Sequence, residues 1–154
     1  MPTANIARYI AGAALVLSGT IGAVLALAIG TARMLIAQGV AVTPADAALI
    51  EDLVAVLPFI VAFALGAIVA AMGVLQGRVW ADRLGTGIGI VGGTVAALGL
   101  LLIGVGRDPL AANAAVTWPV DGVGILAVAF VIHALAVMAI SLAAGGETAS
   151  RPAS

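Results

Sequence analysis

The segment Gly122–Ala144, GVGILAVAFVIHALAVMAISLAA, contains no Asp, Glu, Lys or Arg and carries a single imidazole, His133. A run of about 20 apolar residues is long enough to cross the hydrocarbon core of a bilayer as a helix. Three further stretches share this character, at about Tyr9–Ala32, Leu53–Gln76 and Leu84–Gly106. Open strand edges cannot face lipid, so each stretch is expected to be helical. The sequence therefore predicts an all-α polytopic membrane protein, a bundle of four transmembrane helices.

The composition agrees with this class. Of the 154 residues, 64% are hydrophobic and only 8% are charged, and the mean hydropathy is +1.28. Soluble domains have about a quarter charged residues. The absence of cysteine excludes disulfides and thiolate metal sites. The hydrophobic composition makes membrane lipid an expected partner. The six basic residues form no basic run and the net charge is -1, so we expect no binding to nucleic acid or to an anionic lipid surface.

The chain also resembles itself at an offset of 74 residues. In this register SGTIGAVLALAIGTAR (18–33) lies over GGTVAALGLLLIGVGR (92–107), with seven of sixteen positions identical. The matches include a Gly-Thr pair and the final arginine, which a composition rich in Ala, Gly and Leu does not explain. The tripeptide AVT at 41–43 meets a second AVT at 115–117 in the same register. These matches predict a duplicated helical hairpin.

The duplication predicts the domain organisation. Two helices return the chain to the side where they began, so the two copies have the same orientation and are related by an axis along the membrane normal. We expect one four-helix transmembrane domain, residues 1–154, built as a tandem pair of two-helix hairpins. The hairpins lie at about 6–76 and 84–144, and a flexible C-terminal tail follows at 145–154.

Arginine placement predicts the orientation, because cytoplasmic loops carry an excess of positive charge. Four arginines lie at one end of the predicted spans and two at the other. The larger group consists of Arg8, Arg78, Arg83 and Arg151. We therefore expect the chain in the cell (plasma or inner) membrane with both termini in the cytoplasm.

The second span has readable local chemistry in VTPADAALIEDL. Thr43 is a predicted N-cap, Pro44 takes the first helical position and Asp46 follows three residues after the cap. The helix is therefore expected to begin near Pro44. Pro58 falls inside the span, where its ring removes a backbone hydrogen bond, so we expect a static bend there rather than a hinge.

Small residues recur every four positions in three of the spans, a spacing that lets helix backbones approach closely. Such a face can pack against a helix of the same chain or against a partner subunit, and we favour packing within the chain. The predicted helix-packing residues are Gly22, Gly30, Gly66, Gly85, Gly89 and Gly93.

Four polar side chains are expected near the middle of the membrane: Ser18, Thr20, Thr94 and His133. A neutral imidazole offers one donor and one acceptor, and hydroxyls can satisfy both. We expect His133 to bond to Thr94 or Thr20, an interaction worth about 1 kcal/mol. The alternatives are an axial ligand to a haem or pigment and a polar group lining a cavity. Proton relay is disfavoured because no carboxylate lies inside any predicted span.

The symmetry of the two hairpins is broken at His133. The second helices of the hairpins align only after a slip of about four residues, which places Phe63 over His133. At the opposite end, Arg33 closes the first span where Glu51 and Asp52 open the second, so an ion pair at the membrane interface is expected.

Elimination guides the functional prediction. Serine hydrolysis would need Ser18 or Ser141 next to His133, but Ser141 lies eight residues along the same helix. A single histidine without cysteine makes a metalloenzyme implausible. We therefore expect no enzyme and no metal, and absence of a cofactor is the favoured expectation. We expect a non-catalytic accessory or structural subunit of a larger membrane complex, associating with other subunits or with itself. The alternatives are a channel or carrier for a small neutral solute and a haem- or pigment-binding subunit that uses His133.

Overall fold

The computed structural model describes residues 2–106 and 122–148, and helices account for nearly all of them. The helices are α1 (Pro2–Ala37), α2 (Pro44–Leu75), α3 (Val79–Gly106) and α4 (Gly122–Thr148). All four are long and apolar enough to cross a membrane. The predicted four-helix membrane bundle is therefore confirmed.

The bounds of the helices differ from the predicted spans mainly at their ends. α1 begins at Pro2, before the predicted start near Tyr9, and ends at Ala37. α4 extends through Thr148, into the segment predicted as a tail. The remainder of that tail and residues 107–121, between the third and fourth predicted spans, lie outside the described residues.

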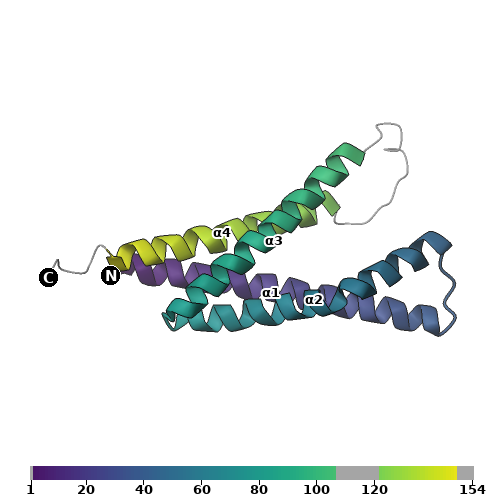
Figure 1. Cartoon of the computed structure of the whole chain (residues 1–154), viewed down its shortest axis with the longest axis horizontal. Coiled ribbons are helices and arrows are strands. Elements are labelled where there is room, and N and C mark those ends of the chain that lie inside the picture. The colour runs from purple at the N-terminus through teal and green to yellow at the C-terminus, as the bar shows by residue number, and fades with distance from the viewer. Residues whose placement is uncertain (1, 107–121, 149–154) are drawn as a thin grey trace.

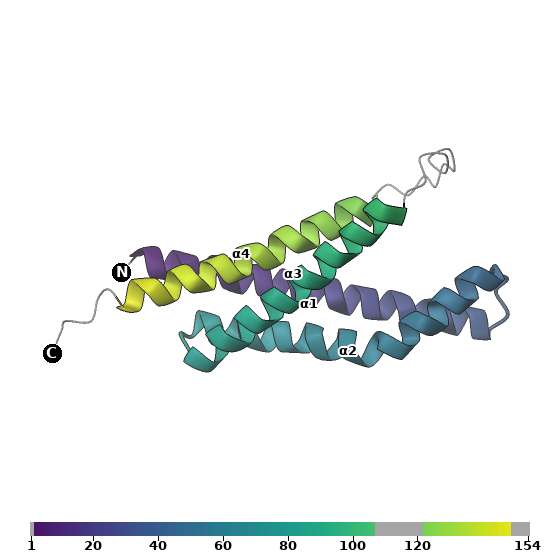
Figure 2. The same ribbon diagram turned by 45° about the horizontal axis from the view of Figure 1, so that its top comes forward.

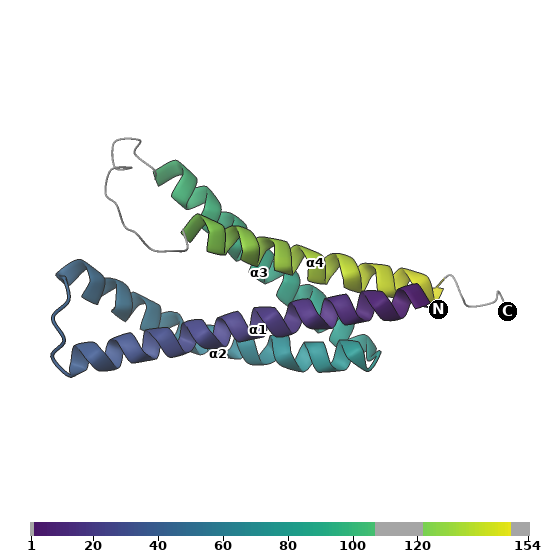
Figure 3. The ribbon, with the colours of Figure 1, turned by 180° about the vertical axis from the view of Figure 1, so that it is seen from behind.

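The four helices run up and down along one axis (Figure 1). α1 packs mainly on α2 and α4, and α3 packs mainly on the same two helices, so α1 and α3 are diagonal and α2 and α4 are diagonal. The N-terminus, the α2–α3 turn and the end of α4 lie at one end, which we call the closed end (Figures 1 and 3). Toward the other end, the α1–α2 and α3–α4 hairpins diverge (Figures 1 and 2).

The core lies at the closed end and consists largely of alanine. Its fully buried members, at 0% exposure, are Ala11, Leu15, Ala67, Ala70, Ala71, Val74 and Ala81. Small side chains bring helix backbones into van der Waals contact, which drives association where lipid removes the hydrophobic contrast between helices. Large apolar side chains point outward instead: Leu27 is 71% exposed and Phe59 is 76% exposed. An apolar exterior around an alanine core is the arrangement of a membrane protein.

The predicted small-residue faces are mostly used within the chain. A Cβ placed on Gly85 would lie 2.9 Å from Cδ1 of Ile140, and one on Gly22 would lie 3.0 Å from Cβ of Ala64. Gly66, Gly89 and Gly93 likewise face neighbouring helices. Gly30 is the exception, because a Cβ there would meet no described atom within 4 Å. The prediction that Gly30 packs between helices is wrong for this chain, because Gly30 lines an open groove between α1 and α2.

The start of α2 follows the capping chemistry of its sequence. The Thr43 side chain accepts a hydrogen bond from the backbone N–H of Asp46 at 3.2 Å, and its hydroxyl donates to the Asp46 carboxylate at 2.6 Å. Pro44 occupies the first turn, where no backbone donor is needed. Pro58 lies inside α2, and the α2 ribbon is visibly bent (Figure 1). The predicted cap and the predicted bend are both present.

Arg8 ties α1 to the end of α2. Its side chain is 8% exposed, and its Nη1 donates to the carbonyl oxygen of Val74 at 3.2 Å. Gly77 follows with φ +70°, and a Cβ there would lie 2.5 Å from the same Nη1. The last carbonyls of a helix lack intrahelical partners and carry partial negative charge, so a guanidinium stabilises them. Arg8 is thus a structural contact as well as an interfacial charge.

We expect Arg8→Ala to lower the stability of the detergent-solubilised protein by about 1.5–3 kcal/mol, the range for a hydrogen bond from a charged donor. Arg33→Ala serves as the control, since Arg33 lies in an exposed ion pair expected to contribute about 0–1 kcal/mol. Thermal unfolding followed by circular dichroism measures both. Equal losses in the two variants would contradict the role of Arg8.

Candidate functional site

His133 lies on α4 and is buried, with 8% of its surface exposed. Its Nδ1 lies 2.6 Å from the carbonyl oxygen of Ala129, and its Nε2 lies 2.8 Å from the Ser18 hydroxyl oxygen on α1. A carbonyl can only accept, so in the neutral ring Nδ1 carries the proton and donates it to Ala129. Nε2 is then the acceptor, and Ser18 donates to it. Both ring nitrogens therefore have partners inside the bundle.

Two further helices complete the surroundings of the imidazole. The Phe63 ring on α2 lies with its centroid 5.9 Å from that of His133, at an interplanar angle of 47°. On α3, a Cβ added to Gly92 would overlap His133 Nε2, so the ring occupies the space that any side chain at position 92 would need. Ser18, Phe63, Gly92 and His133, one from each helix, form what we call the central layer.

The central layer matches the internal alignment. Ser18 and Gly92 are equivalent at the offset of 74, and Phe63 and His133 are equivalent after the slip of four. Each equivalent pair lies on diagonal helices, as an axis between the hairpins requires. A serine and a phenylalanine in the first hairpin thus face a glycine and a histidine in the second. The duplication itself stays a prediction, and this arrangement is consistent with it.

Of the four polar residues that were expected near the middle of the membrane, the structure brings Ser18 and His133 together and leaves Thr20 and Thr94 apart. The predicted bond from His133 to Thr94 or Thr20 is wrong, because Ser18 is the partner on Nε2. Thr20 instead donates to the Val16 carbonyl of its own helix at 2.9 Å. Thr94 is exposed on the outer side of α3. The rotation of each helix about its axis decides which polar residues at one depth can meet.

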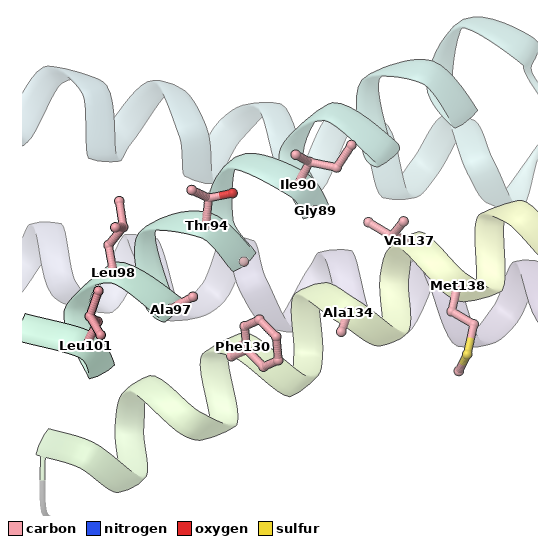
Figure 4. A pocket seen from close by; sticks show the side chains of 11 residues that line it. Gly89, Ile90, Thr94, Ala97, Leu98, Leu101, Phe130, Ala134, Val137 and Met138 are labelled. Carbon is pink, nitrogen blue, oxygen red and sulfur yellow. The ribbon is translucent and has the colours of Figure 1, made fainter. Parts of the chain in front are cut away.

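Thr94 lines an apolar groove of about 720 Å³ between α3 and α4 (Figure 4), which we call the α3–α4 groove. Its walls include Leu98 and Leu101 from α3 and Phe130 and Met138 from α4. A second groove, of about 570 Å³, lies between α1 and α2. Each groove lies between the two helices of one hairpin, and the residues that line both grooves are mostly apolar.

The expected interfacial ion pair joins Arg33 to Glu51. Arg33 Nε lies 3.8 Å from Glu51 Oε1, and the two side chains are 58% and 65% exposed. Asp52, the other candidate, is not part of this pair. An exposed pair at this separation contributes little to stability. It links the ends of α1 and α2 and offers no enclosed site for an ion.

Ser18 and His133 together resemble the nucleophile and base of a serine hydrolase, so their chemistry needs separate consideration. Acyl transfer also needs donors for the developing oxyanion and room for a substrate carbonyl. Ser18 is 3% exposed and lies mid-helix, where backbone N–H groups already bond to carbonyls one turn earlier. Phe63 and the Gly92 backbone close the other sides of the ring. This arrangement favours an interhelical contact over a nucleophile.

His133 is also the side chain that an axial-ligand role would use. Binding a metal through Nε2 would require the ring to release Ser18 and to leave the space beside Gly92. Within 2–106 and 122–148, no group of three His, Cys, Asp or Glu side chains comes together around a possible metal ion. In this structure the Nε2 atom that an axial ligand would use is instead paired with the Ser18 hydroxyl.

The fold and the central layer define an integral membrane bundle whose buried imidazole is held by its own helices. Comparison with protein-family models, curated proteins and solved structures finds no match to this chain. Sequence reasoning missed Phe63 and Gly92 as neighbours of His133. The alignment of the hairpins held the signal, because it pairs Phe63 with His133 and Gly92 with Ser18.

We expect Gly92→Ala to destabilise the protein by about 1–3 kcal/mol, because the new methyl group overlaps the imidazole. Gly87→Ala is the matched control on the same helix: no described atom lies within 4 Å of a Cβ there, and alanine favours a helix by about 1 kcal/mol. The measurement is unfolding in mixed micelles. In a His133→Ala background the cost of Gly92→Ala should shrink, and an unchanged cost would contradict the proposed clash.

Proposed function

We propose that this chain is a non-catalytic structural or accessory subunit of a larger membrane protein complex. The observation that carries the proposal is that both nitrogens of His133 bond to groups of the bundle itself, Ser18 and Ala129. A polar group used in this way contributes to helix pairing and is not available for a substrate or a ligand. The extensive apolar exterior supplies surface for neighbours in the membrane.

The geometry supports this proposal better than the two alternatives. A carrier would need its polar groups along one path, yet Thr20 bonds to its own helix and Thr94 faces outward. The closed end is also filled by Leu15, Val74 and alanines with 0% exposure. A haem or pigment subunit would have to give up the Ser18–His133 bond. Association with other chains requires neither change.

Purification in a mild detergent tests the proposal. We expect an affinity-tagged chain to copurify with at least one other membrane protein in a fixed ratio. Leu27→Trp is the control for non-specific apolar contacts: Leu27 is 71% exposed, so this variant enlarges one side chain on the apolar outer surface. A chain that always migrates without a second kind of protein, at every detergent concentration, would overturn the proposal.

We also propose that the closed end faces the cytoplasm and that the bundle lies in the cell membrane. Support comes from the arginine asymmetry of the sequence, since Arg8, Arg78 and Arg83 belong to the closed end. Arg33 belongs to the opposite end, near the α1–α2 loop.

Single cysteines test the orientation, because the natural chain has none. Gln38 and Gln76 are exposed residues at the ends of α1 and α2 and serve as a matched pair on opposite sides. In intact cells a membrane-impermeant maleimide should label Gln38→Cys and spare Gln76→Cys until the cells are opened. The reverse pattern would place the closed end outside.

A further inference from the structure

The packing between the two hairpins ends at the central layer. The residues of the hydrophobic core lie at the level of this layer or between it and the closed end, among them Leu15 on α1, Ala67 on α2 and Ile140 on α4. The opposite end, where the hairpins part, we call the diverging end (Figures 1 and 2). Toward it, no residue of 44–62 in α2 or of 126–131 in α4 is buried. The described halves of the hairpins on this side of the layer therefore share no core.

The glycines show the same change of neighbours along the bundle. On the side of the closed end, a Cβ on Gly85 of α3 would lie 3.0 Å from Cδ1 of Leu15, which belongs to the other hairpin. Toward the diverging end, a Cβ on Gly99 of α3 would lie 3.0 Å from Cδ1 of Leu126, in the same hairpin. Gly22 of α1 likewise faces α2, its partner in the first hairpin. Each hairpin thus stays packed on itself where the two hairpins part.

The apolar runs of both hairpins are longer than the hydrocarbon core of a bilayer. Residues 9–32 of α1 and 84–106 of α3 contain no Asp, Glu, Lys or Arg, and at a rise of 1.5 Å per residue these runs are about 36 and 34 Å long. The hydrocarbon core is about 30 Å thick. A helix whose apolar run exceeds this thickness tilts, which keeps its apolar residues in the hydrocarbon. Because the hairpins share no core toward the diverging end, each can tilt away from the other there without loss of core packing.

We propose that the hydrophobic thickness of the bilayer sets how far the two hairpins diverge, with the central layer as the pivot. In a thin bilayer a larger tilt moves the diverging ends of the hairpins apart, and in a thick bilayer a smaller tilt brings them together. The Ser18–His133 bond and the alanine core hold the closed end together in both. This response requires only a bundle that spans a membrane, and not the proposed role as a subunit.

Distances between nitroxide labels in bilayers of two thicknesses test the response. Leu27 and Leu101 are equivalent at the offset of 74, are 71% and 60% exposed, and lie nine residues from Ser18 and Gly92 toward the diverging end. The chain with Leu27→Cys and Leu101→Cys is labelled and reconstituted into short-chain dimyristoleoyl- or long-chain dierucoylphosphatidylcholine. At about 13 Å from the pivot, a change in tilt of about 10° in each hairpin changes the separation by about 4–5 Å. Double electron–electron resonance should therefore give the longer distance in the short-chain lipid.

Two control pairs locate the movement. Ile10→Cys with Leu84→Cys has the same offset of 74, and these residues are 47% and 39% exposed, but they lie toward the closed end, so their distance should be the same in both lipids. Leu27→Cys with Phe59→Cys lies within the first hairpin and should also keep its distance. An unchanged or shorter Leu27–Leu101 distance in the short-chain lipid overturns the proposal, and so does an equal change in either control pair.

Discussion

The interior of a bilayer offers no water, so every polar group carried into it needs a partner from protein. The imidazole of His133 meets this constraint with the Ser18 hydroxyl on one side and the Ala129 carbonyl on the other. One bond stays within α4, and the other joins α4 to α1. The requirement that the imidazole be hydrogen-bonded therefore contributes to the pairing of α4 with α1.

The central layer shows how two similar hairpins can differ in composition and still pack together. The ring of His133 takes the space beside Gly92, whereas the equivalent position in the first hairpin carries Ser18, which supplies the hydrogen bond. A side chain at position 92 would leave no room for the His133 ring. The serine, the glycine and the histidine are therefore coupled, and Phe63 covers the remaining face. Between this layer and the closed end, buried alanines fill the core of the bundle.

Much of the fold was predictable because it depends on local order along the chain. Hydrophobic length predicts four helices, Thr43 and Asp46 predict the start of α2, and Pro58 predicts its bend. The candidate site was only half predictable. Depth in the membrane can be counted along a helix, so Ser18, Thr20, Thr94 and His133 were placed at one level. Which of them face one another depends on helix rotation, and no local pattern specifies that angle.

Residue order alone determined that this chain has four helices long and apolar enough to cross a membrane, and which polar groups lie near their middles, because these follow from apolar length and position. The tertiary structure decided that Ser18 and His133, 115 positions apart, are hydrogen-bonded, and that Thr94 is exposed on the outer side of α3. It also decided that Gly92 provides the space for the ring, while Gly30 packs against nothing described. The physical reason is that side-chain volumes from four helices must fit together at once, and this is a property of no single segment.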